Sequence, residues 1–151
     1  MNDAPKKSVS LALLKAVDET EMEIIWPGGT EGTGWFVTLA GPGHSKSIAI
    51  SQAVGKKSLR KQAQIESATV NGKKYKPADV EVDEQRRENI ENIVGRIVTW
   101  RGLTDEAGAE VKFTDEVAVG MFLDQALGWA YWQIVEALGD ERSFTKRSAT
   151  S

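Results

Sequence analysis

Hydrophobic and polar positions alternate in the first third of the chain as they do in β-strands. Charged and apolar residues alternate over the first residues of the segment 21–26, and Trp35, Val37 and Leu39 occupy every second position of residues 34–41. This period places successive side chains on opposite faces of a strand. The segment between them, PGGTEGTG, is rich in glycine, which adopts the positive φ angles of tight turns at little cost. The pattern therefore predicts a β-hairpin.

Helical patterns follow the hairpin. Residues 45–68 favour a helix, but Gly55 interrupts the run and the apolar positions form no clean stripe, which predicts a mostly exposed or kinked helix. Asn71 and Gly72 form a turn signal. A second helix is predicted from Asp83, where acidic residues complement the helix dipole. Its apolar stripe, followed by Trp100 at the end of the helix, consists of Ile90, Ile93, Val94 and Ile97.

The carboxy-terminal third is also predicted to be helical. A linker with a turn over residues 105–108 precedes it, Thr114 stands at a capping position, and Gly128 offers a break between two helices. Residues 9–17 fit either a strand or one or two helical turns. We predict an α+β fold, in which an N-terminal β-hairpin or small antiparallel sheet precedes a mostly helical C-terminal part. One domain spans residues 9–144, between disordered tails at residues 1–8 and 145–151.

Composition is that of a single globular domain. The chain has 151 residues, of which 40% are hydrophobic and 27% are charged, and it has no cysteine. It has neither a run of about 18 apolar residues nor the pattern of a signal peptide. We therefore expect a cytoplasmic protein without disulfides or contact with membranes.

Charge is unevenly distributed along the chain. Residues 44–77 are basic, whereas residues 79–91 are mainly acidic, and the net charge is −3. Nucleic acid is one conceivable partner of the basic stretch, but only Tyr75 adds an aromatic ring to it, so a solvated helix surface is the favoured interpretation. This possible basic surface consists of Lys56, Lys57, Arg60, Lys61, Lys73, Lys74 and Lys76.

Catalytic motifs are not recognisable. The glycine-rich stretch has the Gly29 to Gly34 spacing of a phosphate-binding loop, but Trp35 stands where that loop requires lysine. His44 is the only histidine, and the paired carboxylates are adjacent in sequence, so they point in different directions. We expect a protein that is not an enzyme and that uses no cofactor and no metal.

The segment LDQALGWAYWQIVEALG is apolar on nearly all sides of a helix. Such a helix is either enclosed by its own domain or offers one side to another chain. Both interpretations stay open, because Trp, Tyr and Met are also enriched at interfaces. The residues predicted to bind a partner are Met121, Phe122, Trp129, Tyr131, Trp132 and Val135.

The order of these features resembles the tail assembly chaperones of long-tailed bacteriophages and prophages. The resemblance covers the hairpin GTGWFVTLAGPGH, the charged middle, the stretch IVGRIVTWRGLTDEAGAEVKFTDEVA, the aromatic helix and the closing DERSF. Its most specific portion spans residues 100–115, where WRGL, an acidic turn with Gly108 and KFTDE follow one another. The basic stretch has no counterpart in it.

The resemblance implies a role in assembly. Chaperones of this group bind the tape measure protein, prevent its aggregation and help tube subunits to polymerise around it. It implies that the tape measure protein and the major tail tube protein are partners in the host bacterial cytoplasm, and that the chaperone is absent from the mature virion. Three further hypotheses remain: a structural head-tail connector or tail terminator of the virion, a small nucleic-acid-binding regulator, and a homo-oligomeric state.

Overall fold

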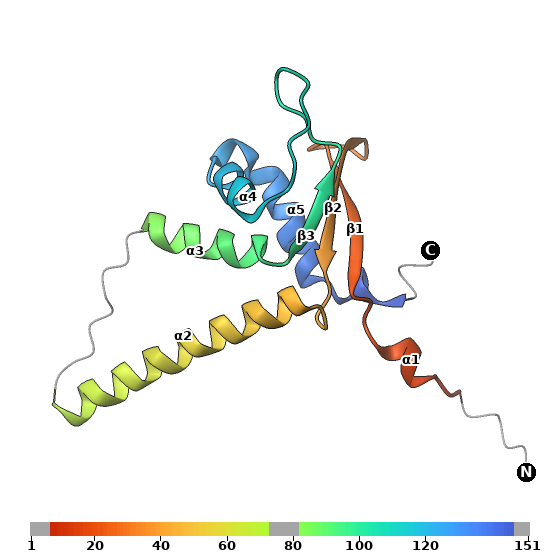
Figure 1. Ribbon diagram of the computed structural model, residues 1–151. Helices are drawn as coiled ribbons and strands as arrows, with labels where there is room; N and C mark the ends of the chain where they lie inside the picture. The colour runs from red at the N-terminus through yellow and green to blue at the C-terminus, as the bar shows by residue number, and fades with distance from the viewer. Residues whose placement is uncertain (1–6, 73–81, 147–151) are drawn as a thin grey trace, which may run out of the picture.

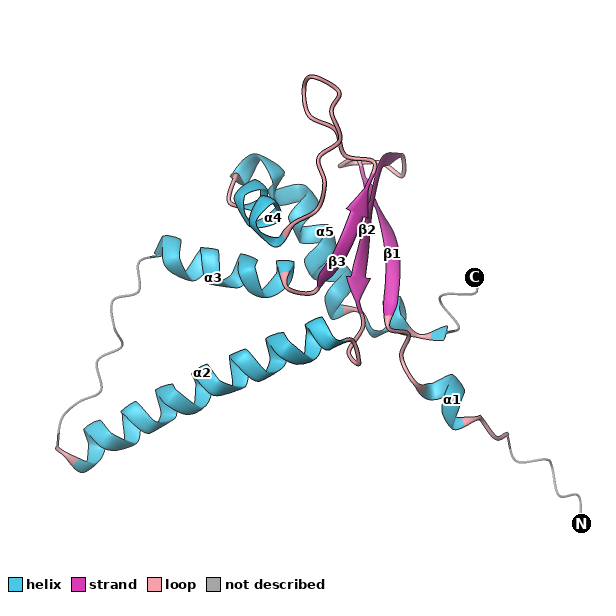
Figure 2. Cartoon of the chain, viewed as in Figure 1, coloured by secondary structure: helices cyan, strands magenta, loops and turns pink. Residues whose placement is uncertain are grey.

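The computed structural model describes residues 7–72 and 82–146. Three strands form one antiparallel sheet of order β1-β2-β3, and helices of the C-terminal third pack against it (Figures 1 and 2). The fold is therefore α+β, as the sequence predicts. Along the chain the elements are α1 (Leu11–Leu14), β1 (Glu19–Ile25), β2 (Gly32–Ala40), α2 (Ser45–Val70), α3 (Val82–Val94), β3 (Ile97–Arg101), α4 (Asp115–Phe122), the 3₁₀ helix η1 (Gln125–Leu127), α5 (Gly128–Gly139) and the 3₁₀ helix η2 (Glu141–Phe144).

The predicted hairpin is present. β1 and β2 pair antiparallel, with Met22 opposite Val37, and the N–H of Trp26 donates to the carbonyl of Glu31 at 2.9 Å to close the loop. Gly28 has φ 80°, a value that glycine adopts without strain. The glycine-rich stretch is thus a turn that joins two strands.

The third strand was not predicted. We expected Ile97 to end a helical stripe and Trp100 to lie at the end of that helix, but α3 stops at Val94 and both residues are on β3. A bulge explains the error: Thr38 pairs with Thr99 while Leu39 pairs with Ile97, so Val98 is an extra residue. Ile97 and Trp100 therefore both face the core although they are three residues apart, which is a helical spacing.

Helix α3 ends where the turn that follows it comes close to α2. A side chain at Gly95 would collide with Ile50 of α2. The N–H of Arg96 donates to the carbonyl of Ile93 at 2.9 Å, and the carbonyl of Arg96 then accepts from Ala40 N–H at 2.8 Å. The chain consequently turns directly from α3 into the sheet.

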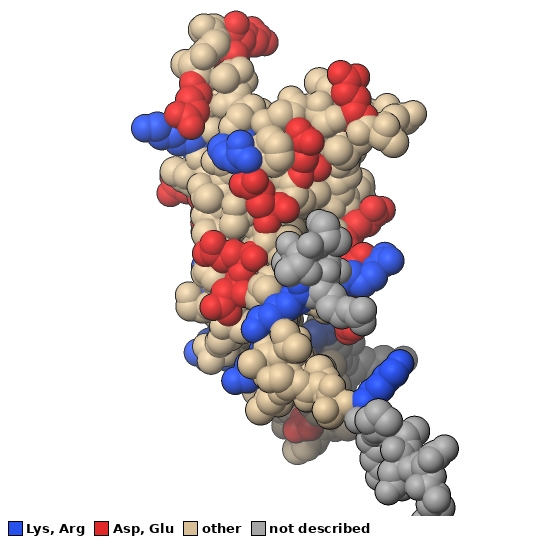
Figure 3. Space-filling model, turned by 90° about the vertical axis from the view of Figure 1, so that its right-hand side faces the viewer, with Lys and Arg blue, Asp and Glu red and all other residues tan. Residues whose placement is uncertain are grey.

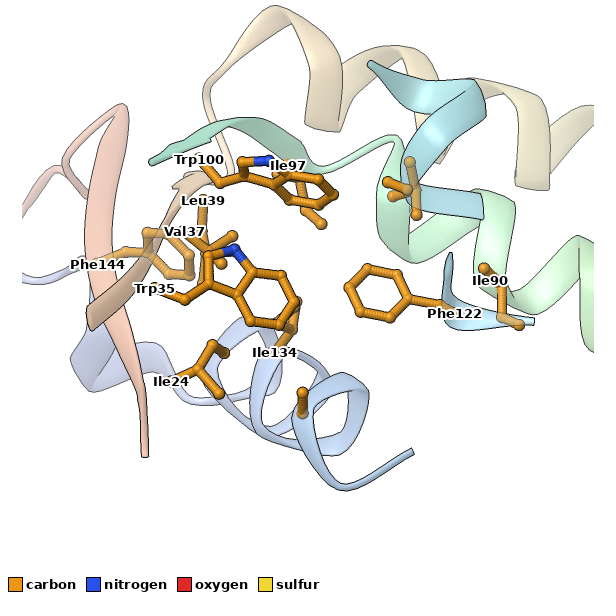
Figure 4. Packing of buried hydrophobic residues seen from close by; sticks show 13 residues of the cluster. Ile24, Trp35, Val37, Leu39, Ile90, Ile97, Trp100, Phe122, Ile134 and Phe144 are labelled. Atoms are coloured by element: carbon orange, nitrogen blue, oxygen red, sulfur yellow. The ribbon is translucent and has the colours of Figure 1, made fainter. Parts of the chain in front are cut away.

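Aromatic rings dominate the core between the sheet and the helices (Figure 4). The Trp35 ring meets Trp100 edge to face at 5.5 Å between centroids, and Phe122 of α4 stacks on Trp35 at 6.2 Å. The buried Trp100 indole donates to the carbonyl of Val111 at 2.8 Å, which satisfies its polar atom and holds the loop after β3 against the core. In that loop, Asp105 accepts from the N–H groups of Ala107 and Ala109, which forms the predicted turn.

The opposite face of the sheet is polar. The Arg101 guanidinium lies over the Phe36 ring at 4.0 Å and donates to both carboxylate oxygens of Glu21, at 2.9 and 3.2 Å. These hydrogen bonds lower the pKa of the Glu21 carboxyl. Figure 3 shows acidic side chains spread over the side of the molecule where β1 lies. This face is adapted to water.

Helix α2 has few contacts with the rest of the fold. It is one continuous helix that extends away from the sheet (Figure 1), and Ser47 is its only buried residue. Of the two predicted forms, mostly exposed or kinked, the mostly exposed helix is therefore the right one. Gly55 does not interrupt it. At the same end of the hairpin, before β1, the helical interpretation of residues 9–17 holds for the exposed turn α1. Most residues of the two predicted disordered tails lie outside the described ranges.

Candidate partner-binding surface

Capping side chains define the helices that carry the aromatic residues. Thr114 accepts from the N–H of Val117 at 3.1 Å and begins α4, as predicted. Asp124 accepts from the N–H of Ala126 at 2.9 Å and begins η1. Helix α5 then starts at Gly128, which is the predicted break. The aromatic segment is thus a separate, rigid helix.

One side of α5 packs against the sheet. Ala130 and Ile134 are fully buried there. The Gln133 amide makes two bonds with the backbone of Ile25, because its oxygen accepts from the N–H and its nitrogen donates to the carbonyl, both at 2.9 Å. These bonds fix α5 against β1 and satisfy two backbone groups of an edge strand.

The other side of α5 leaves large rings accessible. Trp132 is 61% exposed, and Trp129 is partly exposed three positions earlier, on the same side of the helix. Trp26, which follows β1, stacks on Trp129 at 5.7 Å and is itself 50% exposed. We call Trp26, Trp129 and Trp132 the indole surface.

A pocket adjoins the indole surface between α3 and α5. Its volume is about 360 Å³, and Ile90, Phe122, Tyr131 and Trp132 contribute its apolar part. The Arg86 guanidinium also lines it and donates to the carbonyl of Phe122 at 3.3 Å. Burial raises the pKa of the Tyr131 hydroxyl, so this group stays protonated at neutral pH. The pocket combines aromatic walls with polar groups, as sites for apolar anchors do.

The predicted binding residues fall into three classes. Trp132 is exposed, whereas Met121, Trp129, Tyr131 and Val135 are partly exposed. Phe122 is buried, at 1% exposed, and packs among Trp35, Trp100 and Tyr131, so it offers no open surface, although it also lines the pocket between α3 and α5. Its role is structural.

Sequence reasoning missed Trp26. The pattern of residues 21–26 showed an aromatic residue at a strand end before the Pro27 turn, but it did not show that α5 would lie beside that end. The only available signal was an indole next to a turn, where few neighbours can enclose it.

The predicted basic surface is partly described. Lys56, Lys57, Arg60 and Lys61 are exposed on α2, and Lys57 forms an ion pair with Glu88 of α3. Lys73, Lys74 and Lys76 lie outside the described residues. The basic charges thus follow a projecting helix and are partly balanced by α3.

His44 has a local structural role. Its Nδ1 accepts from the N–H of Lys46 at 3.1 Å and caps α2, while its Nε2 lies 3.5 Å from a carboxylate oxygen of Glu19. Within residues 7–72 and 82–146, no three His, Cys, Asp or Glu side chains gather in a group that could hold a metal ion. The same ranges contain no helix with the length and apolar character needed to span a bilayer.

Comparisons of the chain with protein-family models, with curated proteins and with solved structures find no match. The functional interpretation therefore rests on the residues and their geometry. In the part of the chain that the structure describes, the indole surface and its adjoining pocket form the largest group of accessible aromatic side chains.

Proposed function

We propose that this protein is a phage tail assembly chaperone that binds an apolar helical segment of the tape measure protein. Its action is non-catalytic and takes place in the bacterial host cytoplasm, and the protein is absent from the mature virion. The major tail tube protein is a further proposed partner. The observation that carries this proposal is the pair of exposed indoles: Trp132 on α5, which is packed against the sheet, and Trp26 after β1, which stacks on Trp129 of α5.

The energetics of the indole surface favour a protein partner. Covering the exposed part of one indole removes on the order of 100 Å² of apolar area from water, which contributes roughly 2–3 kcal/mol. Two such rings supply binding energy typical of interface hot spots. Because α5 is fixed by Ile134 and Gln133, little conformational entropy is lost when a partner binds.

The geometry also favours a helical partner. An amphipathic client helix presents apolar residues at spacings of three and four, and it can place one of them in the pocket between α3 and α5 while the next contacts Trp132. Met121 and Val135 are partly exposed on α4 and α5 and would extend the contact. A reversible complex of this kind would keep an apolar client from aggregating until assembly.

Co-expression with the proposed client, the tape measure protein of the same phage or prophage, tests the proposal. The wild type should raise the soluble fraction of that client, and the double variant Trp26→Ala/Trp132→Ala should not. Leu59→Ala is a matched control, because Leu59 is 68% exposed but lies on α2. If the wild type leaves the client's solubility unchanged, the chaperone function is wrong.

Two alternatives make different predictions. A head-tail connector or tail terminator would be found in stoichiometric amounts by mass spectrometry of purified virions, whereas the chaperone would be missing. A nucleic-acid-binding regulator would use the exposed Lys56, Arg60 and Lys61. It would shift DNA or RNA in a gel, and the shift would weaken steeply with salt.

A further inference from the structure

A second cavity lies away from the residues assigned above. It has a volume of about 410 Å³, opens to solvent, and is lined by α1, the start of α2, the end of β2, the end of α5 and η2. Its apolar wall includes Leu14, Pro42, Leu138 and Phe144, and its polar lining includes Ser47, Ser51 and Arg96. We call it the Arg96 pocket.

Arg96 is the unusual group in this pocket. The residue is partly exposed, but its Nε is buried without a hydrogen-bond partner, and among the described residues no side chain forms an ion pair with its guanidinium. A buried charged donor without an acceptor is costly, and native proteins normally satisfy such groups. The guanidinium is therefore prepared to receive an acceptor that is not part of the described chain.

The surroundings favour an anion beside Arg96. Ser47 and Ser51 lie in the first two turns of α2, where the positive end of the helix dipole is found. The buried Ser47 hydroxyl already donates to the carbonyl of Ala40 at 3.2 Å, whereas Ser51 is exposed. Glu141 is the acidic residue of the lining, and it is exposed and forms no ion pair with Arg96. Among residues 7–72 and 82–146, no anion therefore pairs with the guanidinium.

The apolar wall restricts which anion fits. A small inorganic ion would leave the surfaces of Leu14, Leu138 and Phe144 in contact with water. A carboxylate matches the planar fork of a guanidinium, and an attached hydrocarbon group would cover the wall.

We propose that the Arg96 pocket binds a carboxylate joined to a short branched apolar group. Two sources share this chemistry: a small free acid, and the C-terminal residue of a peptide. The proposal is independent of the chaperone function, because it involves neither the indole surface nor the tape measure protein.

Titrations followed by NMR of the arginine Nε–Hε signals test the proposal on the full chain. The probes are N-acetyl-leucine, its neutral amide, 3-methylbutanoate and inorganic phosphate. N-acetyl-leucine should shift the Arg96 signal saturably, while the amide should bind at least about tenfold more weakly because it lacks the charge-assisted bonds. Phosphate should cause no saturable shift.

The titration with 3-methylbutanoate distinguishes a small free acid from a peptide C-terminus as the natural ligand. Binding of 3-methylbutanoate as tight as that of N-acetyl-leucine assigns the pocket to a small acid, and a clear preference for N-acetyl-leucine assigns it to a peptide terminus. Equal binding of the acid and its amide, or no saturable binding of either carboxylate, would overturn the proposal.

Variants localise the effect. Arg96→Gln should weaken carboxylate binding at least about tenfold, followed for this variant through backbone amide shifts of the pocket residues. Arg142→Gln is the matched control, because Arg142 is exposed and is paired with Asp140 of the neighbouring turn. Arg96→Lys retains the charge but not the planar fork, so this variant should bind the carboxylate with intermediate affinity. It also provides a test if the glutamine variant does not fold. Unchanged affinity in the Arg96 variants contradicts the proposal.

Discussion

Helices α2 and α5 both leave apolar side chains in water, but they do so in opposite ways. Helix α2 has 26 residues and one of them, Ser47, is buried, so its exposed aliphatic groups lie on a helix that projects from the fold. Helix α5 has 12 residues, and it is held to the sheet by Ala130, Ile134 and the Gln133 amide. Its exposed groups are large rings on a fixed support.

The difference shows which exposed surface is suited to a specific partner. The apolar positions of α2 are irregularly spaced and include Val54, Leu59 and Val70, which give no continuous stripe. Helix α5 is apolar on nearly all sides, so the sheet covers one side and the indoles remain on the other. A rigid aromatic surface loses less entropy on binding than a projecting helix does. We therefore propose α5, rather than α2, as the helix that binds the client.

The strongest contrast is expected between a core position and an α2 position. Phe122→Ala should lower the free energy of unfolding by about 3–5 kcal/mol, because it leaves a cavity among Trp35, Trp100 and Tyr131. Leu59→Ala should change it by less than about 0.5 kcal/mol. Urea unfolding monitored by circular dichroism measures both. Losses of similar size would mean that α2 is packed in solution.

The next effect concerns affinity. Trp26→Ala/Trp132→Ala should weaken binding of a client-helix peptide at least about tenfold, because two exposed rings can no longer be covered. The midpoint of urea unfolding should fall only modestly, since both rings are at least half exposed and the main packing loss is the stack of Trp26 on Trp129. Fluorescence anisotropy of a labelled peptide measures the affinity, with Leu59→Ala as the control. Equal affinity of the wild type and the double variant would contradict the assignment to α5.

A smaller effect is expected within α2. Gly55→Ala should stabilise the helix locally by about 1 kcal/mol, since an added Cβ would meet nothing within 4 Å. The global unfolding free energy should change less than this, because Gly55 is exposed on α2 and Ser47 is the one buried residue of that helix. Hydrogen exchange of the α2 amides measures the free energy of local unfolding of this helix. Slower exchange throughout the fold would show that α2 and the core unfold together.

The smallest expected effect is on the pH dependence of stability. The hydrogen bonds from Arg101 lower the pKa of Glu21 in the folded protein. The ion pair therefore contributes stability that is fully present above the unfolded-state pKa of about 4.3. This stability is lost as the pH falls through the lower pKa of the folded state. Glu21→Gln should therefore flatten the fall in unfolding midpoint between neutral and acidic pH. Identical profiles of the two proteins would show that the pair contributes nothing.

The sequence predicted the hairpin because β1 and β2 follow a simple two-residue period, and it predicted the turns and caps because Asp105, Thr114 and Gly128 act locally. It did not predict β3, since the bulge at Val98 gives Ile97 and Trp100 a helical spacing. Local patterns identify elements, but they do not show a register shift that depends on the neighbouring strand.

The candidate sites were only partly predictable for a related reason. Trp132 was predicted because α5 carries more apolar residues than one side can bury. The burial of Phe122 and the exposed position of Trp26 beside α5 were not predicted, because each depends on which elements lie side by side in the fold. The Arg96 pocket combines residues from both ends of the chain, and no sequence pattern brings these together.

Photo-crosslinking from α5 and from α2 tests the central assignment most directly. A photoreactive phenylalanine analogue replaces Trp132 in one variant and Leu59 in another, and each is produced together with the tape measure protein. The account predicts a crosslink to the client from position 132 and none from position 59. A crosslink from position 59 alone, or none from either position, would contradict it.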